Sequence, residues 1–73
     1  MPASRILNKY GERVRQLRKR SGLTQEELAE LAGLHQTYIG VVERGEKNIS
    51  LMNIERIAKS LSVTMSEFFS PFK

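Results

Sequence analysis

Apolar residues recur every three or four positions along almost the whole chain, which is the spacing of one face of an α-helix. From about Asn8 to Ser21, Tyr10, Val14 and Leu17 form an apolar stripe among mostly charged residues. Nowhere do apolar and polar residues alternate for long enough to suggest a β-strand. The pattern therefore predicts an all-α fold, with five short helices around one core.

Capping residues and glycines set the boundaries of the other helices. Thr24 with Glu27, and Thr64 with Glu67, match the capping box that begins a helix, so the second and fifth helices are expected to start directly after these threonines. The remaining expected boundaries are Gly22, Gly33 and Gly45 as stops, a third helix from about Gln36 to Arg44, Ser50 as the cap of the fourth helix, and Pro71 as the end of the fifth. The residues expected to face the core in the second to fourth helices are Leu28, Leu31, Ala32, Ile39, Val42, Ile54, Ile57, Ala58 and Leu61.

The second and third helices are joined by only about three residues, 33–35. Helices so close in sequence cannot pack as an antiparallel hairpin and must cross steeply, as in a helix-turn-helix. Such a crossing needs a small residue where the two backbones meet and a turn residue that accepts a positive φ, and Ala29 and Gly33 stand at these positions. The apolar residues available for its inner face are Leu28, Ala32, Leu34, Ile39 and Val42. The sequence predicts a helix-turn-helix at about residues 25–44.

This stretch resembles the helix-turn-helix of the phage-repressor-like (Xre) DNA-binding family. The residues that carry the resemblance are Gln25-Glu26-Glu27-Leu28-Ala29, Gly33, Tyr38-Ile39 and Glu43-Arg44-Gly45. The likeness spans about Val14 to Phe69. It implies a compact five-helix DNA-binding domain in which the second helix of the motif enters the major groove.

Within that family the chain is most similar to the stand-alone controller proteins of restriction–modification systems. The similar stretches are Thr37-Tyr38-Ile39, Glu43-Arg44 and Asn48-Ile49-Ser50-Leu51. The chain departs from their pattern at His35 and Gln36, where many controllers carry an acidic residue followed by Arg. The resemblance implies a regulator of transcription that binds a specific operator.

The outward face of the third helix carries no charge. We expect Gln36, Thr37, Tyr38, Gly40 and Val41 to lie on it. A helix that reads base edges needs amide and hydroxyl groups, methyl groups for thymine and small residues for close approach. We predict that Gln36, Thr37 and Val41 read bases, while Tyr38 contacts the backbone or a deformable base step. The alternatives are a short helix half covered by a neighbour and, for Tyr38, a partly buried aromatic residue.

A second set of residues is predicted to hold the DNA backbone. Gln25 stands at the first position of the second helix, where free N–H groups and the helix dipole favour a phosphate, and the resemblance places a matching Gln against the backbone. Arg44, Lys47 and Asn48, at the end of the third helix and in the loop after it, are candidates for phosphate or minor-groove contacts. His35, at the N-cap of the third helix, is expected to cap it or to contact a phosphate rather than to catalyse a reaction.

Arg18 and Glu43 are predicted to form a partly buried ion pair that ties the first helix to the third. Arg18 lies next to the Val14–Leu17 stripe and Glu43 follows the inward Val42, so both stand at the margin of the core. Their pattern also matches a pair in the resembled family. The alternative is two independent surface charges.

The end of the chain is predicted to form a dimer interface. The segment of about 61–73 contains Met65, Phe68, Phe69 and Phe72, and thus all three phenylalanines of the protein. A core this small has room for one or two of them, with Phe68 continuing from Leu61 and Val63, so the others would form an exposed apolar patch. Two copies of one helix-turn-helix are also needed to read a site of useful length. The alternative is that all of these residues pack onto their own core.

Composition narrows the classes of function. With 73 residues the chain makes one small domain, spanning 1–73, without room for the deep cleft of most enzymes. The lack of cysteine and the single histidine argue against disulfides and a metal site, and no apolar run is long enough to span a membrane. No secretory signal is visible, so the expected location is the cytoplasm. We expect no catalytic activity, no cofactor and no small-molecule ligand.

The charge balance favours a polyanionic partner. Lys and Arg outnumber Glu by twelve to eight, and seven of the twelve lie before Thr24, with one acid among them. A binder of anionic membranes would need Tyr10, Val14 and Leu17 free to insert, whereas the core needs them. The leading hypothesis is a transcription regulator, a restriction–modification controller that binds double-stranded DNA as a homodimer on a pseudo-palindromic operator. The alternatives are a phage- or plasmid-type repressor and an antitoxin-like module that binds a partner protein.

Overall fold

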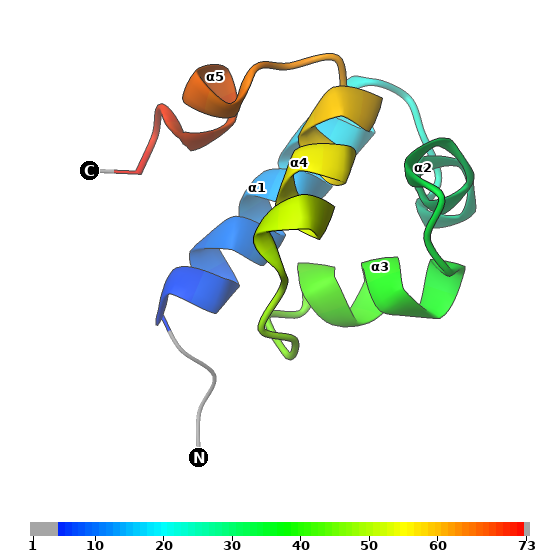
Figure 1. Cartoon of the computed structure of the whole chain (residues 1–73), viewed down its shortest axis with the longest axis horizontal. Helices are drawn as coiled ribbons and strands as arrows, with labels where there is room; N and C mark the ends of the chain where they lie inside the picture. Colours follow the sequence, from blue (N-terminus) through cyan, green and yellow to red (C-terminus); the bar gives the residue numbers. More distant parts are fainter. Residues whose placement is uncertain (1–4, 73) are drawn as a thin grey trace.

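The structure, a computed structural model, describes residues 5–72, and this part of the chain folds into five helices (Figure 1). They are α1 (Arg5–Arg20), α2 (Gln25–Ala32), α3 (Gln36–Glu43), α4 (Leu51–Ser60) and α5 (Met65–Phe69). No strand occurs within the described range, so the predicted all-α class is confirmed. The first helix begins earlier than its predicted start at Asn8, and the third ends one residue early because Arg44 is its C-cap.

The caps that the sequence offered are formed. In both predicted boxes the threonine hydroxyl accepts a hydrogen bond from the backbone N–H of the glutamate, and the glutamate side chain accepts one from the threonine N–H. The backbone N–H of Thr64, followed by its hydroxyl, lowers the pKa of Glu67. A lowered carboxyl pKa stabilises the fold at neutral pH, and this contribution is lost as the pH falls through the lowered pKa. The box at α5 therefore weakens only in acid.

One core lies between the helices. Its fully or nearly buried residues are Tyr10, Val14, Leu17, Leu28, Ala29, Ala32, Ile39, Val42, Ile57, Ala58, Leu61 and Phe68. The expectation that Leu31 faces this core is wrong, because Leu31 is 62% exposed. The short helix α2 meets α3 and α4 with Leu28, Ala29 and Ala32, and that face leaves Leu31 on the solvent side. Ile54 of α4 is only partly buried at the margin of the core.

α1 and α3 approach each other closely at Gly11. This glycine is buried, and a Cβ atom at its position would overlap the backbone carbonyl oxygens of Val42 and Glu43. Backbone atoms at the end of a helix cannot move aside as a flexible side chain can. The missing side chain of Gly11 therefore sets how near the first helix comes to the end of the third, a constraint that the apolar pattern did not indicate.

Gly11→Ala is expected to lower the free energy of unfolding by about 2 kcal/mol or more, although alanine is the better helix former. The added methyl group must push α1 away from the end of α3. Denaturant unfolding followed by circular dichroism measures the change, with Glu12→Ala at the exposed neighbouring position as the control. A Gly11→Ala variant as stable as that control would contradict the close approach.

The end of the chain folds back onto α1. The aromatic rings that follow one another at centroid distances of 4.9, 4.9 and 5.0 Å are Tyr10, Phe68, Phe69 and Phe72. Arg13 adds a polar link, because its Nε donates to the carbonyl oxygen of Phe68 at 2.7 Å and its Nη2 to that of Glu67 at 2.9 Å. These contacts hold α5 against the first helix.

Phe68 is therefore removed from the predicted dimer surface. Its side chain is completely buried in its own core, where a second copy of the chain cannot reach it. The other three residues predicted for that surface are partly buried, namely Met65, Phe69 and Phe72. The aromatic residues at the end of the chain therefore serve mainly to pack on α1, and only part of their surface is left for a partner.

A more exposed apolar surface lies at the start of α4. Leu51 and Met52 are 73% and 68% exposed. They line a hollow together with Glu55 of the same helix and Met65 of α5. Of the residues predicted for a dimer interface, Met65 is thus the one that borders this surface, which we call the α4 patch (Leu51, Met52 and Met65).

Candidate nucleic-acid interface

The turn between α2 and α3 is built from the residues that the sequence indicated. Gly33 has a φ of 70°, and the N–H of Leu34 donates to the carbonyl oxygen of Ala29 at 2.9 Å. Ala29 is 3% exposed, so a small residue does lie where the two helices pack. In Figure 1, α3 lies along the lower edge of the molecule, on the side opposite α5. The predicted helix-turn-helix is confirmed.

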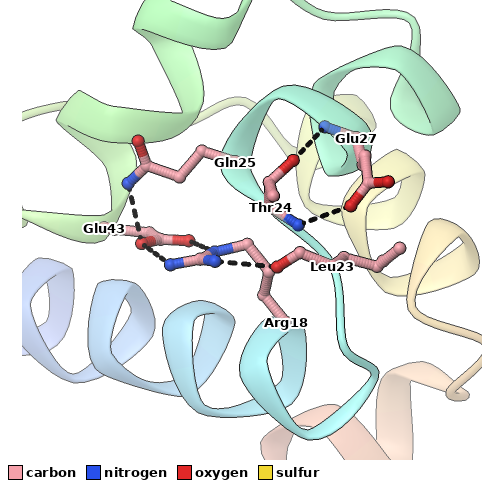
Figure 2. A network of polar contacts seen from close by, with 6 residues as sticks. All are labelled: Arg18, Leu23, Thr24, Gln25, Glu27 and Glu43. Atoms are coloured by element: carbon pink, nitrogen blue, oxygen red, sulfur yellow. Dashed lines mark hydrogen bonds and ion pairs between the residues drawn. The ribbon is translucent and has the colours of Figure 1, made fainter.

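A polar network joins the helices α1, α2 and α3 (Figure 2). Arg18 Nε donates to Glu43 Oε2 at 2.7 Å, and Arg18 Nη2 donates to Glu43 Oε1 at 3.1 Å. Arg18 Nη1 also donates to the carbonyl oxygen of Leu23 at 2.8 Å. Gln25 Nε2 donates to Glu43 Oε1 at 3.0 Å. The predicted ion pair between Arg18 and Glu43 is therefore present, and a hydrogen bond that the sequence did not indicate extends it to Gln25.

The network fixes how α3 is held. The side chains of Arg18 and Glu43 are only 11% and 3% exposed, so the pair is shielded from solvent on a margin of the core. A guanidinium bound to both oxygens of a carboxylate has a fixed geometry as well as a favourable energy. Since Arg18 belongs to α1, Gln25 begins α2 and Glu43 ends α3, their contacts set the position of the third helix relative to the other two.

The start of α3 presents polar side chains to solvent. Gln36 and Thr37 are exposed, and Val41 and Tyr38 are partly exposed. Gly40 does not lie on the open face as expected, because it is buried. A Cβ atom there would lie 3.4 Å from Arg44 Nη1 and 3.7 Å from Gln25 Oε1, so these side chains cover it. The three predicted base readers therefore remain accessible, whereas Gly40, one turn after Gln36, is covered by neighbouring side chains.

The residues predicted for the DNA backbone lie around this face. His35 caps α3, since its Nδ1 accepts a hydrogen bond from the N–H of Thr37 at 3.1 Å. Arg44, Lys47 and Asn48 are exposed. Arg44 Nε lies 3.1 Å from Glu46 Oε2, and both side chains are more than half exposed. An exposed pair of this kind contributes little, so the Arg44 guanidinium is available to a phosphate.

Tyr38 has a partner that sequence reasoning missed. Asn53 Nδ2 donates to Tyr38 Oη at 3.2 Å in a partly buried contact. Near it, the hydroxyl of Tyr10 is buried without a hydrogen-bond partner among the described residues. Burial, and to a smaller extent the neighbouring Tyr38, raises the pKa of Tyr10 far above its usual value, so this hydroxyl stays neutral. Nothing in the apolar pattern marks Asn53, because it occupies an ordinary polar position of a helix.

Metal-ligand clusters and membrane-spanning helices do not occur in the described part of the chain. Between residues 5 and 72 no three side chains of His, Asp or Glu are grouped as metal ligands would be. No helix in that range is long and apolar enough to cross a membrane.

Comparison with known proteins agrees with the fold and the motif. The helix-turn-helix family model matches residues 14–68. The control protein C.BamHI of Bacillus amyloliquefaciens is 51% identical over 55 residues, which cover 74% of this chain and 68% of that protein. The control protein C.MunI of a Mycoplasma species is 40% identical over 63 residues, which cover 85% of each.

Solved structures give the same result. The restriction–modification controller protein C.AhdI from Aeromonas hydrophila superposes with a TM-score of 0.87 at 47% identity, covering 90% of this chain and 100% of that one. The controller C.Esp1396I, solved as a tetramer with its natural 35 base-pair operator, gives a TM-score of 0.88 at 35% identity, covering 93% and 90%. The chain belongs to the helix-turn-helix family and, within it, to the control proteins of restriction–modification systems.

Proposed function

We propose that the protein is a sequence-specific transcription regulator, the controller of a restriction–modification system, and that it binds double-stranded operator DNA. The observation that carries the proposal is the exposed, uncharged start of α3, held from behind by the buried network of Arg18, Gln25 and Glu43. A rigidly held helix with amide, hydroxyl and methyl groups suits the major groove. The operator complex of C.Esp1396I supports the proposal from a relative.

The proposed roles divide the surface in two. Gln36, Thr37 and Val41 read bases, with the Gln36 amide suited to adenine and the methyl groups suited to thymine. The residues proposed to contact the backbone or the groove walls are Gln25, His35, Tyr38, Arg44, Lys47 and Asn48. Gln25 keeps its side chain on Glu43, so its phosphate contact is proposed to come from the backbone N–H groups at the start of α2.

The proposed assembly is a homodimer with a twofold axis. A single α3 covers only a few base pairs, so a pseudo-palindromic operator with half-sites roughly 34 Å apart requires two copies. The α4 patch is the surface proposed to join them, because exposed apolar residues grouped in this way usually mark an interface. The proposed activity is binding alone, by a single domain, without catalysis or cofactor, and its proposed location is the cytoplasm.

Gln36→Ala and Lys47→Ala are expected to weaken binding in different ways. After sites are selected from random DNA with the wild type, Gln36→Ala should cost about 1–3 kcal/mol on the selected duplex and little on a scrambled duplex. Lys47→Ala should weaken both about equally and reduce the slope of affinity against salt by about one unit on logarithmic axes. Fluorescence anisotropy at several salt concentrations measures both. Equal losses on the two duplexes for Gln36→Ala would remove its base-reading role.

A further inference from the structure

The hydrogen bond between Asn53 and Tyr38 is the starting point. Within residues 5–72 no other side-chain hydrogen bond joins α3 to α4. α3 packs mainly on α1 and α2, so the contact reaches Tyr38 from a helix that otherwise gives α3 little support. The donor is an amide and the acceptor a phenol oxygen, at 3.2 Å and partly shielded from water.

Asn53 is itself firmly placed. It lies in the first turn of α4, where its backbone N–H donates to the capping hydroxyl of Ser50 at 3.2 Å. One turn further on, Ile57 is fully buried in the core. The amide of Asn53 therefore extends from a fixed backbone, and its side chain has few ways to reorient while it bonds Tyr38.

Tyr38 lies between the core and the proposed reading surface. Its ring packs against the buried cluster and is only partly exposed. On the helix surface, Val41 is three positions from Tyr38, so the ring borders this proposed base reader, and Thr37 lies one turn before Val41 on the same side. A bond at the hydroxyl end fixes the far end of a side chain whose ring packs against the core.

We propose that Asn53 is a positioning residue for DNA recognition, which holds the hydroxyl of Tyr38 so that the ring stays beside Val41. The proposal rests on the proposed function of α3. It makes Asn53 a determinant of sequence discrimination although it belongs to another helix. Asn53 also directly follows Leu51 and Met52, so the turn that bears the α4 patch is the turn that holds Tyr38.

A double-mutant cycle tests the proposal. The variants are Asn53→Ala, Tyr38→Phe and the pair, and the probes are the duplex selected by the wild type and a scrambled duplex of equal length. Each single change is expected to lower the ratio of the selected-duplex affinity to the scrambled-duplex affinity about five- to tenfold, and Asn53→Ala should change binding to the scrambled duplex less than about twofold. The double variant should be no weaker than either single variant, because both remove the same bond. Ser60→Ala, at the far end of α4, is the matched control.

Asn53→Asp separates positioning from simple structural support. Its carboxylate can accept a hydrogen bond from the Tyr38 hydroxyl. The ratio of selected-duplex to scrambled-duplex affinity should therefore stay near that of the wild type. The added negative charge should weaken both duplexes alike. In the Tyr38→Phe background the ratio is already lowered, and Asn53→Asp should not restore it, because no hydroxyl is left to bond.

Four results would overturn the role of Asn53. Additive losses in the cycle would mean that Asn53 acts without Tyr38, for example by its own contact with DNA. Equal losses on both duplexes would mean that Asn53 only supports the fold. So would a lower melting temperature with an unchanged ratio of selected-duplex to scrambled-duplex affinity. If the wild type selects no sequence at all, the proposed function fails and this inference fails with it, an outcome visible before any variant is made.

Discussion

Glu43→Ala is expected to lower the free energy of unfolding by about 3 kcal/mol or more. The substitution leaves the Arg18 guanidinium shielded from solvent without its anion, and it removes the acceptor of the Gln25 amide. An unpaired buried charge costs far more than the pair contributes when complete. Urea unfolding followed by circular dichroism measures the loss.

The chain offers a matched control for this experiment. Glu46 also forms an ion pair, with Arg44, but both side chains are more than half exposed, so Glu46→Ala is expected to change the stability by less than about 1 kcal/mol. Removing Arg18 together with Glu43 should recover part of the loss, because neither charge is then left alone. Strictly additive effects of the single and double substitutions would mean that the two charges act independently.

Leu51→Glu is expected to raise the dissociation constant of the homodimer about 100-fold or more. Leu51 is the most exposed large apolar residue of the described chain, and the substitution places a charge in the centre of the α4 patch, close to Glu55. Both copies carry the change, so the cost of burying an unpaired charge is counted twice at a twofold interface. Sedimentation over a range of concentrations measures the constant without DNA.

Leu31→Glu is the control for the dimer prediction. Leu31 is 62% exposed on α2, so the same substitution at a leucine of similar exposure tests whether the effect belongs to the α4 patch. We expect it to leave the dissociation constant unchanged. Operator binding should fall with the loss of the dimer for Leu51→Glu, since each half-site then binds its monomer alone. A variant that remains dimeric would place the interface elsewhere, with the partly exposed Phe69 and Phe72 as the next surface to change.

The helices and the motif could be predicted because their signals are local. The capping boxes at Thr24 and Thr64 need only residues three positions apart, and the turn at Gly33 needs only a residue that accepts a positive φ. The ion pair of Arg18 and Glu43 could also be predicted, because each residue borders a buried position on its own helix. For the caps and the turn, the physical cause lies within one or two turns of the chain.

The candidate site could be predicted only in outline. Thr37 is exposed because it lies on the side of α3 away from the inward Ile39, as the helical period requires, and Gln36 is exposed at the first position of the helix. Gly40 was misplaced, since the side chains that cover it come from Gln25 and from Arg44 one turn on. The period of a helix says which side a residue lies on, but not which neighbouring side chain folds over it.

The sequence by itself thus determined an all-α fold, the places where its helices begin and end, and a helix-turn-helix with a polar outer face. Only the tertiary structure decided which apolar residues are left for a partner, since Leu51 and Met52 stay in solvent. It also decided that Gly11 must lack a side chain and that Asn53 reaches Tyr38. The physical reason is that burial and close approach depend on how distant helices pack together, and an apolar pattern records only which residues can be buried.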